Sequence, residues 1–67
     1  MGANANFENA KLASTSFFKA DLSKANFAGA DLTGASLEEA GLDGANLENA
    51  VLQSAYLTRT IVDAASI

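Results

Sequence analysis

Cysteine, histidine, tryptophan and proline are all absent from this sequence of 67 residues. Without cysteine there is no disulfide framework, no thiolate nucleophile and no soft metal site, and the redox compartment cannot be inferred. Without histidine, the commonest general base and metal ligand is missing. No apolar run approaches the length of a membrane-spanning segment. We therefore expect no bound cofactor, no metal and no membrane partner.

Positive charge is also scarce. Four Lys/Arg residues stand against eight Asp/Glu residues, and the formal net charge at pH 7 is −4. Contact with a nucleic-acid backbone requires a basic surface, so we expect no direct nucleic-acid partner. Residues Met1–Asn6 lack the basic and apolar regions of a secretion signal. The expected location is cytoplasmic by default, unless the chain is excised from a longer or processed protein.

What the sequence does contain is a five-residue repeat that extends from Ala5 to Ile67. The first position of each unit is alanine, or threonine at Thr15 and Thr60, and the third position is a large apolar residue. Thirteen units follow one another without insertion or deletion, with third positions at Phe7, Leu12, Phe17, Leu22, Phe27, Leu32, Leu37, Leu42, Leu47, Leu52, Leu57, Val62 and Ile67. A fixed internal period of this kind determines the architecture of a chain.

A period of five fits neither a helix nor an ordinary strand. Five residues advance an α-helix by about 500°, so the large apolar side chains would spiral around every side of it. The alternation of a strand is also broken, because the first and third positions recur at intervals of two and three residues. A short extended stretch followed by a corner satisfies this pattern. Repetition then winds the chain into a solenoid with the first and third positions inside.

The fifth position of each unit marks a corner. It is glycine or asparagine at Asn9, Gly29, Gly34, Gly44 and Asn49. These residue types tolerate the positive φ that a type II turn requires at its third residue. In other units the fifth position is Ser14, Lys19, Lys24, Glu39, Ser54 or Arg59. For those corners we expect either another turn geometry or some strain.

The motif Ala-Asp-Leu, as in Ala20-Asp21-Leu22 and Ala30-Asp31-Leu32, resembles the repeat of the pentapeptide-repeat family. The resemblance covers Ala5–Ile67 and implies an all-β fold, a right-handed quadrilateral β-helix (solenoid) with four units in each coil and about three coils. It also implies that the second, fourth and fifth positions point outward. We expect residues 1–67 to form a single pentapeptide-repeat β-helix domain. The departures from the motif are Thr15, Thr60, Val51, Tyr56 and Ile61.

Four units contain twenty residues, so residues twenty apart should lie above one another at the strand spacing of about 4.8 Å. Asn6, Asn26 and Asn46 then align, which suggests a ladder of amide side chains. Alternatively, asparagine simply suits the start of a strand beside a corner. Lys19, Glu39 and Arg59 also align, with alternating charge. Each exposed pair of this kind is worth only about 0.2–1 kcal/mol.

The pattern does not indicate catalytic chemistry. The serines, including Ser23 beside Lys24, have no histidine to activate them, and their placement follows the repeat. The repeat pattern predicts no cleft around the acidic pair Glu38 and Glu39. We therefore expect no enzymatic activity and no catalytic residues.

Outward apolar residues are the candidate contact sites. Val51, Tyr56 and Ile61 occupy the second position of three consecutive units, which places them on three successive sides of the last full coil. Phe18 is a separate outward residue. Single exposed apolar residues are ordinary, but these four also suit a surface that binds a protein partner or a second copy. Both coil ends expose unpaired strand edges, so we expect self-association through a coil end, with a homodimer as the commonest symmetric outcome.

Two functions follow as hypotheses. The first is a non-catalytic structural or protein-interaction module, because the resemblance is to a family of mostly scaffold-like proteins. The alternative is a DNA-mimicking inhibitor of a type II topoisomerase (gyrase), which the acidic surface and rod shape suggest. About three coils at strand spacing measure only about 15 Å, or about four base pairs, so we favour the interaction module.

Overall fold

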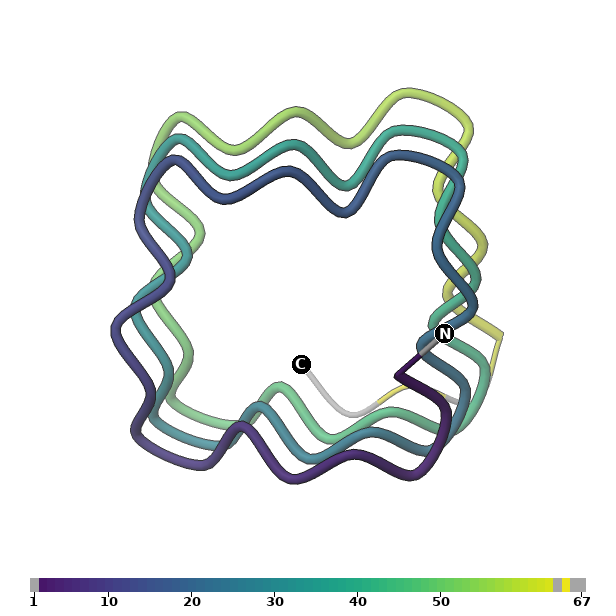
Figure 1. Ribbon diagram of the computed structural model, residues 1–67, viewed down its shortest axis with the longest axis horizontal. Coiled ribbons are helices and arrows are strands. Elements are labelled where there is room, and N and C mark those ends of the chain that lie inside the picture. Colours follow the sequence, from purple (N-terminus) through teal and green to yellow (C-terminus); the bar gives the residue numbers. More distant parts are fainter. Residues whose placement is uncertain (1, 64, 66–67) are drawn as a thin grey trace.

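The computed structural model describes residues 2–63 and 65 of the chain. The chain winds through stacked square coils, and each side of a square is one five-residue unit (Figure 1). The fold is a right-handed quadrilateral β-helix, as the family resemblance implies. Within the described residues there is no helix, and the β-structure consists of isolated parallel bridges between the second positions, from Asn6 to Ile61.

Every bridge joins residues that are twenty positions apart. Asn6 pairs with Asn26, and Asn26 pairs in turn with Asn46. Two hydrogen bonds flank such a bridge: the Phe7 N–H donates to the Asn26 carbonyl at 2.7 Å, and the Asn26 N–H donates to the Ala5 carbonyl at 2.9 Å. The four sides repeat this pattern, which confirms a coil of twenty residues. The columns of residues predicted from the sequence are therefore present.

All corners share one backbone geometry. The N–H of each first position donates to the third-position carbonyl of the unit before it, as from Ala10 to Phe7 at 3.0 Å. The fifth position has a positive φ in every described unit from Asn4 to Arg59, whether or not it is glycine. At Ser14, Lys19, Lys24, Glu39, Ser54 and Arg59 the φ angle lies between 59° and 62°.

The suggestion of another turn geometry at those six corners was therefore wrong. A residue with a Cβ loses roughly 1–2 kcal/mol in this left-handed conformation. At Ser14, Lys19, Lys24 and Glu39 the corner is nevertheless retained because its N–H bonds to the next coil, as from Lys24 to the Asp43 carbonyl at 2.7 Å. Ser54 and Arg59 are held from the previous coil, where the Gly34 and Glu39 N–H groups bond to the Gln53 and Thr58 carbonyls, both at 2.9 Å. A different turn would break these bonds and the square outline. Stacking between coils thus overrides the local preference of the residue.

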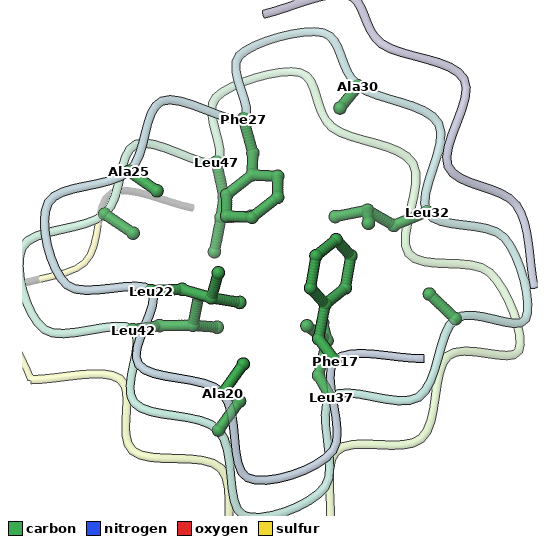
Figure 2. Packing of buried hydrophobic residues seen from close by; sticks show 13 residues of the cluster. Phe17, Ala20, Leu22, Ala25, Phe27, Ala30, Leu32, Leu37, Leu42 and Leu47 are labelled. Carbon is green, nitrogen blue, oxygen red and sulfur yellow. The ribbon is translucent and has the colours of Figure 1, made fainter. Parts of the chain in front are cut away.

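The first and third positions fill the interior, where their side chains point toward the coil axis (Figure 2). Phe27, Leu32 and Leu37 are completely buried. Three phenylalanine rings meet in the N-terminal half, with ring centroids 5.7 Å apart for Phe7 and Phe17 and 5.9 Å apart for Phe17 and Phe27. No aromatic residue occupies a third position after Phe27. The core therefore becomes less bulky toward the C-terminus.

Burial declines at both ends of the stack. Phe7 and Leu12 are only partly buried against the core. Leu57 and Val62 occupy inward positions but are 46% and 44% exposed. Thr60 occupies a first position that is usually alanine, and its hydroxyl donates to the Leu37 carbonyl at 2.7 Å.

Among the described residues, no helix has the length and apolar character needed to cross a membrane.

Candidate interaction surface

The polar second positions satisfy backbone groups beside the corners. The Oδ1 atoms of Asn6, Asn26 and Asn46 each accept the N–H of the residue two positions later, at 2.9 Å. Asp21 and Asp31 accept in the same way from Ser23 and Thr33, at 3.1 and 3.0 Å. Asparagine and aspartate at the second position therefore form hydrogen bonds within their own unit and stabilise the corner that follows.

The asparagine column is aligned through its backbone, but its amide oxygens bond within their own units. This arrangement supports the simpler of the two predictions, in which asparagine suits the start of a strand beside a corner. The side chain brings an acceptor to an N–H that would otherwise face solvent, as in an Asx turn. The column is thus not evidence for a ligand site.

Two aspartates receive a second hydrogen bond. The hydroxyl of Ser23 donates to Asp21, and the hydroxyl of Thr33 donates to Asp31, both at 2.6 Å. These hydroxyl bonds, with the backbone N–H of the same residue, lower the pKa of each carboxyl group below its usual value. Hydrogen bonds to the ionised form have this effect because they stabilise the charge. Asp21 is exposed and Asp31 is partly buried.

The predicted contact residues all lie on the surface. Val51, Tyr56 and Ile61 are 45%, 60% and 51% exposed, and Phe18 is 52% exposed. The first three bridge to Asp31, Ser36 and Gly41, on three successive sides of the solenoid. Phe18 lies apart from them, near the opposite end, with the Lys19 ammonium 5.2 Å from its ring centroid. The structure therefore brings three of the four predicted residues to one end.

Sequence reasoning missed two residues of this end. Leu57 and Val62 were assigned to the interior by their third positions, yet both are exposed. The exposure of an inward residue depends on the neighbouring coil: Leu57 covers Leu37, whereas no described residue lies twenty positions after Leu57. We call this end of the coil axis the C-terminal face. Its inward residues are Leu52, Leu57 and Val62, and the outward residues at its rim are Val51, Tyr56 and Ile61.

Other surface features carry little chemistry. One open depression follows a corner column and is lined by Ser23, Lys24, Asp43, Gly44 and Asp63. Within residues 2–63 and 65 no group of three or more histidine, cysteine, aspartate or glutamate side chains is arranged to hold a metal ion. The depression combines a lysine with two carboxylates on an open corner, an arrangement typical of a solvated surface.

Comparison with known proteins identifies the class of protein. The family model for pentapeptide repeats matches residues 3–39 and 30–66, which together span nearly the whole chain. The chain belongs to the pentapeptide-repeat family. Members of this family are generally structural or interaction modules without enzymatic activity. The family resemblance seen in the sequence is confirmed.

Three solved structures are similar to the chain over almost all of its length. A pentapeptide repeat protein from the Arabidopsis thaliana thylakoid lumen is 34% identical over 96% of the chain, with a TM-score of 0.94. HetL from Nostoc sp. strain PCC 7120, which is involved in heterocyst differentiation regulation, is 38% identical over 92%, with a TM-score of 0.90. Rfr23 from Cyanothece 51142 is 33% identical over 96%, with a TM-score of 0.82.

The chain spans less than half of each of these proteins: 44%, 30% and 47% of their respective lengths. The similarity therefore establishes the family and the coil geometry, and it does not transfer the activity of a whole protein to this chain. No curated protein shows a significant match.

Proposed function

We propose that the chain is a non-catalytic protein-interaction module whose contact surface is the C-terminal face. One observation carries the proposal. Among the described residues, the exposed large apolar side chains are Phe18 and five others, and all five lie between Val51 and Val62. Apolar side chains gathered on one end in this way mark contact sites more often than isolated ones do.

Burial of this face would release water from side chains that are now half exposed. The gain is about 25 cal/mol for each Å² of apolar surface removed from water. Tyr56 suits the centre of a contact because tyrosine combines a large apolar ring with a polar tip. Arg59 and Asp63 lie at fifth and fourth positions, on the sides of the coil. The apolar part of the face is thus not interrupted by charge.

The polar residues support a role without catalysis. Asp21 and Asp31 are engaged by Ser23 and Thr33, and the aligned asparagines bond to their own backbone. Ser54 and Ser14 form corners with positive φ. A nucleophile needs a neighbouring base that holds and accepts its proton, and the sequence contains no histidine to do so.

The DNA-mimic alternative has weaker support. The molecule measures 21 × 20 × 19 Å, which corresponds to about six base pairs of duplex DNA at 3.4 Å each. Its acidic excess is also interrupted by Lys11, Lys19 and Lys24 on the first coils. A gyrase supercoiling assay separates the two functions: inhibition at stoichiometric protein would favour the mimic, and no inhibition is expected.

Sedimentation velocity over a concentration series tests the proposed contact surface, using a second copy as the partner. We expect the parent chain to associate as its concentration rises. Ile61→Lys places a charge at the rim of the C-terminal face and should shift the chain toward monomer. Asn6→Lys is the matched control, because it introduces the same charge into the same repeat position at the other end. Equal effects of the two variants, or a parent that stays monomeric at all concentrations, would contradict the proposal.

A further inference from the structure

The two exposed aromatic residues lie on the same side of the solenoid. Phe18 and Tyr56 are 52% and 60% exposed, whereas the other three aromatic side chains pack in the core. Parallel bridges join Ser16 to Ser36 and Ser36 to Tyr56, so the units that contain them stack on one another. We use the term aromatic side for the outer surface of these three units, residues 15–19, 35–39 and 55–59.

Second and fourth positions of one unit face the same outer side. Their side chains contact each other along the chain: the Ser23 hydroxyl donates to Asp21 at 2.6 Å, and the Ser36 hydroxyl donates to Glu38 at 3.5 Å. The aromatic side therefore presents two columns of outward residues. The second positions are Ser16, Ser36 and Tyr56, and the fourth positions are Phe18, Glu38 and Thr58. Each coil thus carries one small and one larger residue on this side.

We propose that two copies of the chain associate through the aromatic side, with parallel solenoid axes related by a two-fold axis. When this axis runs over the inward third positions, each second position faces the fourth position of the same coil in the other copy. Phe18 then faces Ser16 of the second copy, and Tyr56 faces its Thr58. Because a large side chain meets a small one in each pair, both rings are covered without collision, and aromatic rings supply much of the energy of such contacts.

The charged residues favour parallel over antiparallel axes. Lys19, Glu38, Glu39 and Arg59 are the charged residues of the aromatic side. With antiparallel axes centred on the middle coil, Glu38 and Glu39 would each face the same residue of the second copy. Lys19 would face Arg59. Every charged group would then lie opposite a like charge, and such contacts repel.

Parallel axes avoid these contacts. Glu38 then faces Ser36 of the second copy, whose hydroxyl is a suitable donor because it already donates to Glu38 within one chain. At the two edges of the aromatic side, a charged corner column meets an uncharged one. The charged column is Lys19, Glu39 and Arg59, and the uncharged column is Ser14, Gly34 and Ser54.

The area available suits a weak dimer. The molecule measures 21 × 20 × 19 Å and has an accessible surface of 3903 Å². One side therefore carries at most about a sixth of that surface, or about 650 Å², against the ~800 Å² that each partner buries in a standard interface. Because a two-fold contact closes on itself, the mass should stop at that of a dimer, twice 6.8 kDa.

This contact goes beyond the proposed function, because it lies on the side of the coils and includes Phe18, which is remote from the C-terminal face. The two contacts are separated by working in the Ile61→Lys variant, in which a charge at the rim opposes association through the C-terminal face. Sedimentation equilibrium of that variant should still show a dimer at high concentration.

Phe18→Ser in the Ile61→Lys chain tests the aromatic side. It removes one ring from each copy and leaves a residue that the repeat already carries at a fourth position, Ser23. The dissociation constant of the dimer should rise by about tenfold or more. Val51→Ser is the matched control, because it removes an exposed apolar residue from the neighbouring side and should not change the dimer.

A monomeric Ile61→Lys chain, or equal effects of Phe18→Ser and Val51→Ser, would overturn the lateral contact and leave the C-terminal face as the contact surface. The opposite result is also distinct. If Phe18→Ser weakens the association of the parent chain and Ile61→Lys does not, the lateral contact is supported and the proposed C-terminal contact is overturned.

A nitroxide label on Ser14→Cys tests the direction of the axes. The absence of native cysteine makes the labelling specific, and Ser14 is an exposed corner at the edge of the aromatic side. Labelled chain is mixed with ¹⁵N-enriched parent chain, so that NMR detects only broadening between copies. Parallel axes bring the label to the Lys19 amide of the second copy. Broadening at Ser54 instead would overturn the parallel arrangement, and no broadening under conditions of association would overturn the lateral contact.

Discussion

The rings of Phe7 and Phe27 stack with their centroids 4.9 Å apart and an angle of 12° between their planes. The two residues are twenty positions apart, and their separation matches the spacing of neighbouring strands, about 4.8 Å. One coil therefore rises by one strand spacing. The ring of Phe17 meets both of the others edge-on, at interplanar angles of 71° and 83°. The three rings pack against one another in the N-terminal half of the core.

The first prediction concerns the centre of the core. Leu32 is completely buried, so Leu32→Ala should lower the free energy of unfolding by about 2–5 kcal/mol. Leu57 has the same repeat position but is 46% exposed, so Leu57→Ala should cost about 1 kcal/mol or less. Urea denaturation measures both. A loss below about 0.5 kcal/mol for Leu32→Ala would show that the inward assignment is wrong.

Two glycines form a matched pair for substitution, because Gly34 is a corner residue with positive φ and Gly41 occupies a bridging second position. Gly34 has a φ of 67° and room for a Cβ, the nearest atom being Ser14 Oγ at 3.6 Å, while Gly41 has nothing within 4 Å. Gly34→Ala should destabilise by roughly 1 kcal/mol because the left-handed conformation strains alanine. Gly41→Ala should stabilise by about 0.4–1 kcal/mol because it lowers the entropy of the unfolded chain. Thermal unfolding with effects of the same sign would count against the corner geometry.

Acid should weaken the fold through Asp21 and Asp31. Their pKa values are lowered in the folded chain by the hydroxyl and N–H of Ser23 and Thr33. A carboxylate with a lowered pKa stabilises the fold above its unfolded pKa of about 3.9, and that stability is lost as pH falls through the folded pKa. The double variant Asp21→Asn with Asp31→Asn should therefore show a flatter fall in stability below about pH 5.

Asparagine is the suitable replacement because it keeps the acceptor, as Asn26 shows with the Ala28 N–H at 2.9 Å. Asp31→Ala is the control: it removes the acceptor, so it should lower stability at neutral pH as well. Denaturant midpoints from pH 7 to pH 2.5 measure both effects, with that range set by the carboxyl pKa of about 3.9. A parent and a double variant with parallel pH profiles would exclude these two carboxylates as the source of acid sensitivity.

The charged column tests the coil register. The Lys19 N–H bonds to the Glu38 carbonyl at 3.0 Å and the Glu39 N–H to the Thr58 carbonyl at 2.9 Å, so Lys19, Glu39 and Arg59 stack. Glu39→Lys places three cations in line and should cost about 0.2–1 kcal/mol. The cost should shrink at high salt because exposed charges are screened. A cost that does not change between low and high salt would be inconsistent with the stacked column.

Much of this fold could be predicted from the sequence because a strict period leaves few choices. The unbroken spacing from Phe7 to Val62 specified which positions face inward and which residues share a column. The corners were harder to predict. Glycine at Gly29 and Gly34 indicated a positive φ, but Lys24 and Glu39 adopt it too, because hydrogen bonds between coils outweigh their local preference.

The candidate surface was predicted less completely. Val51, Tyr56 and Ile61 stood out because they break a polar pattern. Leu57 and Val62 follow the pattern, and their exposure depends on what lies above them in the stack rather than on residue type. That exposure is not visible in a list of side chains.

The central claim, that the C-terminal face is the contact surface, is tested most directly by a dilution series of the isotope-labelled chain followed by NMR. The account predicts that amide shifts change with concentration at Leu52, Leu57 and Val62, whose N–H groups have no backbone partner among the described residues. Amides inside the stack, such as Leu32, should not change. Shifts that are independent of concentration, or changes confined to the sides of the solenoid around Glu38, would contradict the claim.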